Sequence, residues 1–224
     1  MPIETVCVLL AKLIDYAGLF PPAALDMATA LRNYAAYREG EYGWMLGRFV
    51  VPRARAAEVD PSWPTAVLET EPRRMERAGE ITYYEIPLSE DPASLPAGAR
   101  AKIRLGGDSV PEPAAVEEFL RACAAARVAF KATAGLHHPL RKGSAHGFVN
   151  LFLAAALAWR GEKTLATLEE TSASLFRFGE DSVQWHGHRV AAAELREVRE
   201  RFAIGFGSCS FEEPIGDLRE LGWL

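Results

Sequence analysis

The residues best suited to chemistry are cationic side chains inside apolar, strand-like segments. Lys102 and Arg104 alternate along one such segment, and Lys131 and Thr133 alternate along a later one. Residues two apart in a strand share a face, so each pair points the same way. Burying a cation costs free energy unless the cation is paired with an anion or takes part in binding or catalysis. The pattern therefore indicates either salt bridges or, if both strands face inward, a cavity for a small anionic molecule such as a carboxylate or a phosphate.

Lys131 is the candidate nucleophile. Desolvation and the neighbouring charges of Lys102 and Arg104 would depress the pKa of its amine. A lysine that is partly neutral near pH 7 can attack a carbonyl group and form a Schiff base. The alternative interpretation is structural: a salt bridge with Asp15 or Glu85 holds Lys131 protonated.

Histidines follow the Lys131 segment directly, in the sequence Gly-Leu-His-His-Pro. Loops at the carboxyl ends of barrel strands are where sites form, so His137 and His138 are candidates for acid–base or substrate-orienting roles. Zinc needs three protein ligands, and His146 offers a third imidazole, but the spacing matches no recognised ligand pattern. We therefore expect no cofactor, with a divalent metal at the histidines as the alternative.

Further candidates complete a predicted site at the carboxyl ends of the strands. Gly207, Ser208 and Ser210 follow the last apolar segment, where they could hold a phosphate or carboxylate or simply close a turn. The predicted catalytic residues are Lys131, His137, His138 and Asp15. The predicted substrate-binding residues are Lys102, Arg104, Thr133, Arg48, Glu85, His146, Asn150, Gly207, Ser208 and Ser210.

Strand-like and helix-like segments alternate along the whole chain. The predicted strands are residues 14–20, 44–51, 66–69, 81–86, 101–105, 128–133 and 203–206. The predicted helices are residues 3–13, 25–38, 112–127, 148–159, 190–202 and 217–221. Residues 175–185 resemble a β-hairpin, and residues 164–170 fit a helix or a strand equally well.

This alternation predicts a parallel sheet covered by helices. We expect a single α/β domain over residues 1–224, a (β/α)₈ TIM-type barrel with one irregular or missing unit near residues 164–188. The alternative is a doubly wound open sheet, which would need a glycine-rich phosphate turn after its first strand. The first predicted strand ends instead in Phe20-Pro21-Pro22.

Composition narrows the function classes. The chain has 224 residues, a net charge of −5 and 49% hydrophobic residues, which is ordinary globular composition. An acidic chain does not favour nucleic-acid binding. Three cysteines without CxxC spacing indicate a reducing compartment. With no signal-like or membrane-spanning segment, we expect a cytoplasmic protein without a membrane partner, and we leave open whether it forms a homo-oligomer.

Short blocks of the sequence resemble known families. Residues 14–23, 130–139 and 207–214 resemble the signature blocks of a family of uncharacterised bacterial proteins, a resemblance that implies no activity. A weaker resemblance is to class I aldolases of the deoxyribose-phosphate aldolase type. That family has an aspartate in the first strand, a Schiff-base lysine on the sixth and a Gly/Ser phosphate site at the eighth.

The aldolase resemblance implies roles for three segments. Asp15 matches the first-strand aspartate, Lys131-Ala-Thr-Ala-Gly matches the lysine block, and Gly207-Ser-Cys-Ser matches the phosphate site. The His-His-Pro block is foreign to that family, and its strand-seven lysine is missing, with Lys102 as a substitute at best. We expect a lyase or aldolase acting on a sugar phosphate or keto acid through Lys131. The alternatives are a metal-dependent hydrolase or isomerase that uses the histidine pair, and a non-catalytic protein that binds a small anion.

Overall fold

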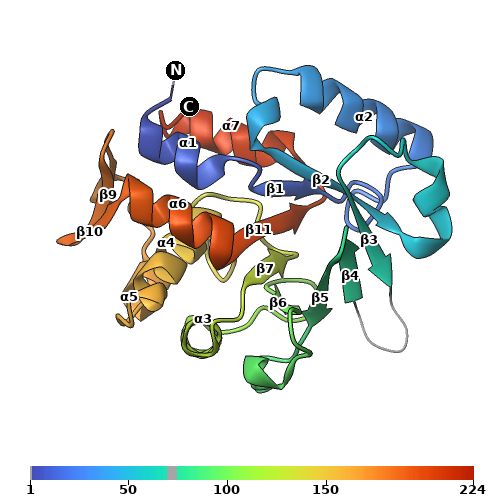
Figure 1. Cartoon of the computed structure of the whole chain (residues 1–224). Coiled ribbons are helices and arrows are strands. Elements are labelled where there is room, and N and C mark those ends of the chain that lie inside the picture. The colour runs from blue at the N-terminus through green and yellow to red at the C-terminus, as the bar shows by residue number, and fades with distance from the viewer. Residues whose placement is uncertain (1, 70–74) are drawn as a thin grey trace.

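A closed barrel organises the molecule. The structure is a computed structural model that describes residues 2–69 and 75–224. Within these residues eight strands close in the order β1-β11-β7-β6-β5-β4-β3-β2, with helices around them (Figure 1). This confirms the predicted α/β barrel. Its strands are β1 (Ile14–Tyr16), β2 (Leu46–Pro52), β3 (Thr65–Glu69), β4 (Met75–Ala78), β5 (Ile81–Glu85), β6 (Arg100–Arg104), β7 (Phe130–Thr133) and β11 (Ala203–Ser208).

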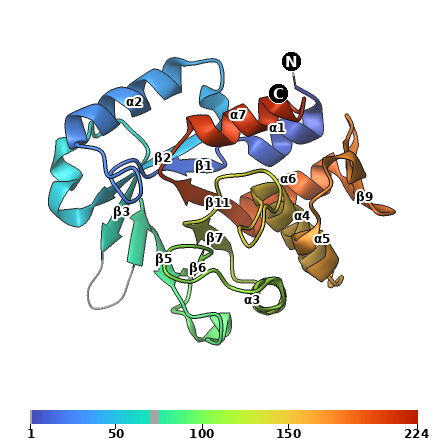
Figure 2. The same cartoon turned by 180° about the vertical axis from the view of Figure 1, so that it is seen from behind.

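Helices lie around the part of the barrel formed by β2, β1, β11, β7 and β6, as the view from behind also shows (Figure 2). They are α1 (Glu4–Leu10), α2 (Met27–Glu39), α3 (Pro113–Ala126), α4 (Phe148–Trp159), α5 (Leu165–Glu169), α6 (Ala192–Arg201) and α7 (Glu212–Glu220). Helix α4 is apolar all round because α3, α5 and α6 pack against it and β11 lies beneath it. Short 3₁₀ turns are η1 (Gly43–Met45), η2 (Arg53–Glu58), η3 (Pro92–Ser94) and η4 (Ala173–Leu175).

One barrel strand runs against the others. Strand β4 pairs antiparallel with both β3 and β5, whereas the other neighbouring pairs of the barrel are parallel. The described residues between β3 and β5 therefore form a strand instead of a crossover helix. The sequence did not predict β4, because Met-Glu-Arg-Ala lacks the β-branched and aromatic residues typical of strands. Strand β4 also places the side chain of Glu76 inside the barrel, where it is buried.

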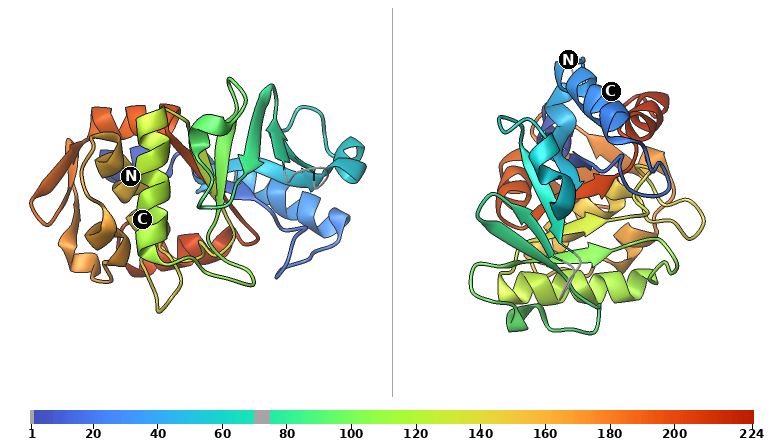
Figure 3. Two further views of the ribbon diagram at one scale, coloured as in Figure 1. Left: turned by 90° about the horizontal axis from the view of Figure 1, so that it is seen from below. Right: turned by 90° about the vertical axis from the view of Figure 1, so that its right-hand side faces the viewer.

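The irregular unit predicted near residues 164–188 lies outside the barrel. Residues 164–170 contain helix α5, and the predicted hairpin is present as β8 (Phe176–Phe178) and β9 (Ser182–Trp185). A third strand, β10 (His188–Ala191), completes a small antiparallel sheet and takes the start of the segment predicted as a helix. This sheet and α2 lie at opposite ends of the molecule (Figure 3).

The two faces of the barrel strands differ in chemistry. Outward residues of β1, β6 and β7 are apolar and belong to the core; for example, the Tyr16 ring stacks on Tyr34 of α2 with centroids 6.4 Å apart. Inward residues include Asp15, Glu76 and Lys131. Barrel interiors are ordinarily filled by bulky branched apolar side chains. The interior of this barrel instead holds charged groups, and they define the candidate site.

Candidate functional site

A buried lysine joins two carboxylates at the centre of the barrel. Lys131 Nζ on β7 donates hydrogen bonds to Asp15 Oδ2 on β1 at 2.6 Å and to Glu76 Oε1 on β4 at 2.5 Å. The Lys131 side chain is 2% exposed, Asp15 5% and Glu76 3%. Strand alternation explains the arrangement, because Phe130 and Ala132 on either side of Lys131 face the helices. The outcome is an ion-paired triad drawn from three strands.

The ion pairs continue toward the carboxyl ends of the strands. Glu76 Oε2 accepts a hydrogen bond from Lys102 Nζ at 3.3 Å, and Lys102 Nζ lies 3.5 Å from Glu85 Oε2. Glu85 Oε1 accepts a hydrogen bond from Arg104 Nε at 2.7 Å. Lys102 is also the direct register partner of Lys131, so the prediction that the two lysines share a face is confirmed. We call this connected set the ion-pair ladder; its members are Asp15, Lys131, Glu76, Lys102, Glu85 and Arg104.

A close approach of the β2 backbone holds Asp15 in place. Asp15 Oδ1 accepts a hydrogen bond from the Arg48 backbone N–H at 2.6 Å. A Cβ atom at Gly47 would lie 2.2 Å from the same oxygen, a distance that real contacts do not allow. Glycine is therefore required at position 47 for the Asp15 carboxylate to reach this backbone donor.

The ladder sets the protonation states of its members. Burial by itself lowers the pKa of Lys131, but the charges of Asp15 and Glu76 and their hydrogen bonds raise it above its ordinary value. Burial by itself raises the pKa of Glu76, but Lys131 and Lys102 bring it below its usual range. The predicted depression of the Lys131 pKa by Lys102 and Arg104 is therefore wrong, because carboxylates lie between the cations. The salt bridge with Asp15 that was the structural alternative is confirmed.

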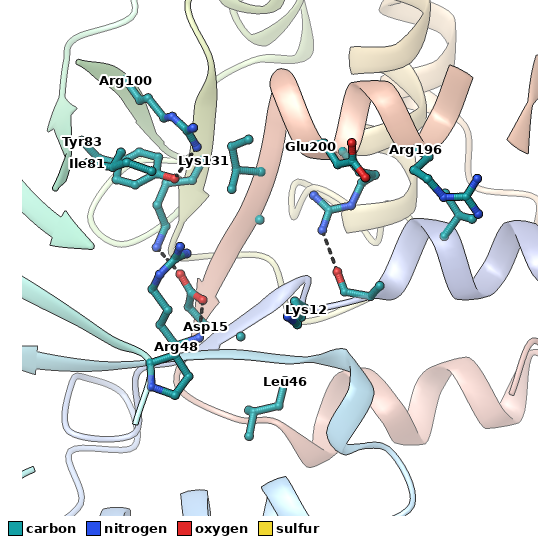
Figure 4. A pocket seen from close by; sticks show the side chains of 17 residues that line it. Lys12, Asp15, Leu46, Arg48, Ile81, Tyr83, Arg100, Lys131, Arg196 and Glu200 are labelled. Atoms are coloured by element: carbon teal, nitrogen blue, oxygen red, sulfur yellow. Dashed lines mark hydrogen bonds and ion pairs between the residues drawn. The ribbon is translucent and has the colours of Figure 1, made fainter. Parts of the chain in front are cut away.

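A pocket of about 650 Å³ opens at the amino ends of the parallel strands. Asp15, Tyr83 and Lys131 line it from inside the barrel. Residues at or just before strand starts, such as Leu46 and Arg100, line its mouth. Figure 4 shows Lys131 reaching toward Asp15, with cationic side chains from several elements around them. We call this cavity the amino-terminal pocket.

Three cations at this pocket are unmatched. Lys12, Arg48 and Arg100 line it, and none of them forms an ion pair with a carboxylate among residues 2–69 and 75–224. Arg100 donates a hydrogen bond from Nη1 to the Tyr83 hydroxyl at 3.1 Å and lies 5.7 Å from the ring centroid. This contact orients the guanidinium but does not neutralise its charge.

Two further arginines at the pocket already have partners. Arg196 pairs with Glu4 at 2.6 Å. Arg199 donates to the carbonyl oxygens of Leu9 at 2.9 Å and Ala11 at 3.1 Å, and also to that of Ala203. Burial lowers the pKa of Arg199 to about 9. Arg199 thus serves to join the end of α1 to the start of β11.

The residues predicted to form one site at the carboxyl ends do not converge. Lys131 lines the amino-terminal pocket, whereas Arg104 lines a separate pocket of about 350 Å³ beside Glu85. The two histidines line neither pocket: His137 Nδ1 lies 2.8 Å from Glu213 Oε2, and His138 Nδ1 lies 2.6 Å from Asp217 Oδ2. Both acids belong to α7. The prediction of a single cavity lined by Lys102, Arg104, Lys131, His137 and His138 is therefore wrong.

His146 and Asn150 lie in the protein interior, away from both pockets. His146 Nε2 lies 2.8 Å from the Pro111 carbonyl oxygen, and burial lowers the pKa of this histidine. Asn150 donates to the carbonyl oxygens of Thr167 at 2.7 Å and Glu170 at 2.8 Å, and it accepts from the Arg141 N–H. These contacts tie the segment before α4 to α5.

Gly207 and Ser208 are the last residues of β11, and Ser210 lies in the turn into α7. Gly207 is the register partner of Thr133 on β7. Ser208 Oγ accepts a hydrogen bond from the Ser210 N–H at 3.3 Å, and Ser210 Oγ accepts from the Glu213 N–H at 3.1 Å. These bonds match the simple turn that the sequence left open as an alternative.

Sequence reasoning missed several residues of the candidate site, namely Glu76, Tyr83, Arg100 and Lys12. Arg100 could have been found, because it continues the two-residue alternation of Lys102 and Arg104. Tyr83 precedes Glu85 by two residues in the same way. Glu76 carried no such signal, since its strand was not predicted.

Three further results concern metal binding, membrane-spanning helices and similarity to known proteins. Among the described residues, no group of three or more His, Cys, Asp or Glu side chains is placed to hold a metal ion. No helix in the described part of the chain combines the length and apolar character needed to cross a membrane. Comparisons of the chain with family models, with curated proteins and with solved structures find no match.

Proposed function

We propose that this protein binds a small anion, a carboxylate or a phosphate, in the amino-terminal pocket. One observation supports the proposal above all: Arg48 and Arg100 line a pocket of about 650 Å³ and have no carboxylate partner among the described residues. Unmatched cations in a cleft with low-dielectric walls attract anions strongly.

Charge at the inner wall of the pocket also favours an anion. The Asp15 carboxylate alone would repel one, but Lys131 neutralises it at 2.6 Å. The guanidinium groups of Arg48 and Arg100 then dominate the local field, and each can bind a carboxylate or phosphate through two parallel hydrogen bonds. The chain as a whole has a net charge of −5, so this positive surface is a local feature.

Calorimetric titration with phosphate, citrate and short-chain carboxylates tests the proposal. Arg48→Ala should weaken binding by roughly 10- to 100-fold, because it removes a charged hydrogen-bonding group. Arg55→Ala is the matched control, since Arg55 is exposed and pairs with Glu58 on the surface. The proposal fails if none of these anions binds, or if both variants bind as the wild type does.

Carbonyl chemistry at Lys131 is a second candidate function. The observation in its favour is that Lys131 and Asp15 both line the amino-terminal pocket, so a ligand there can touch the amine. Lys131 would first pass a proton to Asp15. The neutral amine would then add to the carbonyl carbon, and loss of water would leave an imine.

Borohydride reduction in the presence of pyruvate or glyceraldehyde 3-phosphate tests this second candidate. Reduction of an imine would leave a stable adduct on Lys131, which peptide mass spectrometry can locate. Lys131→Arg keeps the charge and should abolish the adduct. Labelling confined to exposed lysines such as Lys142 would reject the carbonyl chemistry and leave the anion-binding proposal intact.

A further inference from the structure

We infer that the ligand of the amino-terminal pocket is an amphiphilic anion, with one anionic head and a hydrocarbon body. The inference rests on the proposed function and narrows it to a class of ligand. It follows from the apolar side chains of the pocket, from the space available and from the placement of the unmatched cations.

Apolar side chains line one side of the pocket, beside the charged Lys12, Arg199 and Glu200. Val8 belongs to α1 and Ala11 follows its last residue, on the way to β1, and Leu46 and Ile204 come from β2 and β11 on either side of β1. These residues therefore surround the entry to one strand. Ile204 is only half-buried, so hydrocarbon surface remains exposed to the pocket. A ligand that covers this surface would gain hydrophobic free energy that a fully polar anion cannot.

The far side of the mouth combines apolar and cationic groups. Strand β5, across the barrel from β1, supplies the half-buried Ile81, and its neighbour β6 supplies Arg100. The Tyr83 hydroxyl holds Arg100 at 3.1 Å, so its guanidinium is already oriented before a ligand arrives. Arg48 approaches from β2 (Figure 4). A charged head can therefore bind the arginines while a hydrocarbon body lies along the isoleucines.

The volume of the pocket also exceeds what a bare ion needs. About 650 Å³ is within the range of pockets that hold organic ligands, about 300–1,000 Å³. A water molecule takes about 30 Å³ of liquid, so an inorganic anion a few times larger would leave most of the space to solvent. An organic body of several carbon atoms would fill that space.

A homologous series of straight-chain carboxylates from acetate to octanoate tests the inference by calorimetry. Affinity should rise by roughly fourfold for each added CH₂ until the pocket is full. Alkyl phosphates of the same lengths form the second arm. If affinity rises with chain length in either series, the inference is supported. The series that binds more tightly identifies the head group.

Variants then locate the hydrocarbon body. Ile81→Thr and Ile204→Thr keep a β-branched side chain in each strand but place a hydroxyl in the pocket. Each should weaken octanoate binding several-fold and weaken acetate binding much less. Ile3→Thr is the matched control, because Ile3 is 39% exposed and lies outside the pocket lining.

Three negative outcomes can be told apart. Equal binding of acetate and octanoate, with phosphate as tight as its alkyl esters, would overturn the amphiphilic ligand while the anion-binding proposal stands. If no member of either series binds, both proposals fail together. A chain-length effect that survives in both threonine variants would also overturn the inference, because the hydrocarbon body would then lie elsewhere.

Discussion

The two ends of the barrel differ in how their charges are matched. At the carboxyl ends of the strands Arg104 contacts Glu85, and both histidines of the β7–α4 loop contact acids of α7. At the amino ends Arg48 and Arg100 face a pocket and have no carboxylate partner among the described residues. A cation on a strand is therefore not enough to identify a binding site. A binding site is indicated by a cation that has no counter-ion and lies beside an open pocket.

Strand β6 shows this contrast within five residues. Arg100, Lys102 and Arg104 share one face, yet Lys102 and Arg104 meet carboxylates, whereas Arg100 meets the hydroxyl and ring of Tyr83 and no carboxylate among the described residues. Strand β5, which pairs with β6, provides Glu85, and β4, which pairs with β5, provides Glu76; neither provides a described acid at the level of Arg100. The partner strands therefore decide which cations are structural.

The largest effect should come from breaking the centre of the ion-pair ladder. Lys131→Met leaves Asp15 without its ammonium partner and Glu76 with only Lys102, all of them buried. Removing one partner of a buried ion pair costs about 3–5 kcal/mol, so the free energy of unfolding should fall by about that amount. Denaturant titration followed by circular dichroism measures it.

Arg104→Ala is the control for the ladder at the matched carboxyl end. Its side chain is 41% exposed, and pairs of this kind contribute about 0–1 kcal/mol. If Arg104→Ala lowers the free energy of unfolding as much as Lys131→Met does, the contrast between the buried centre and the exposed end of the ladder is wrong.

A smaller and pH-dependent effect is expected for Glu76→Gln. Lys131 keeps Asp15 and Lys102 keeps Glu85, so the loss at pH 7 should be below that of Lys131→Met. The folded-state pKa of Glu76 is lowered. Its stabilising contribution is therefore present above the unfolded pKa of about 4.3 and is lost as the pH falls through the folded-state value.

Urea unfolding of wild type and Glu76→Gln between pH 7 and pH 3 checks this expectation. The difference in unfolding free energy should shrink as the pH falls below about 4. The raised pKa of Lys131 acts in the opposite range: its contribution is complete below its unfolded pKa of about 10.4 and is lost as the pH rises through the folded-state value. A difference that stays constant down to pH 3 would show that Glu76 is not held as a carboxylate.

The smallest effect tests the amino end alone. Gly47→Ala pushes a Cβ atom against Asp15 Oδ1 and should cost about 1–3 kcal/mol, as overpacking does elsewhere. Gly216→Ala is the matched control, because its Cβ would meet nothing within 4 Å and it lies within helix α7. Alanine there should stabilise by about 0.5–1 kcal/mol. Thermal unfolding followed for both variants checks this: if the Tm changes in the same direction in Gly47→Ala and Gly216→Ala, the close approach at Gly47 is contradicted.

Much of the architecture was predictable from local pattern. Helix α4 matches its predicted range, 148–159, strands β5 and β7 lie within their predicted ranges, and β6 begins one residue before its predicted range of 101–105, because periodicity and turn residues act locally. Strand β4 was missed because its residues have little β propensity and tertiary pairing overrides that weakness. With β4 absent, Glu76 could not be foreseen as the shared partner of Lys102 and Lys131.

The sequence alone determined which side chains share a face of each strand, because side-chain direction along a strand alternates with a period of two. It thereby placed Lys102 beside Arg104 and raised a salt bridge between Asp15 and Lys131 as an alternative. Which end of the barrel keeps unmatched cations follows from contacts between distant segments of the chain. That outcome depends on which strands become neighbours and on the reversal of β4, and charges that are 26 to 116 residues apart in the chain meet only when the barrel closes.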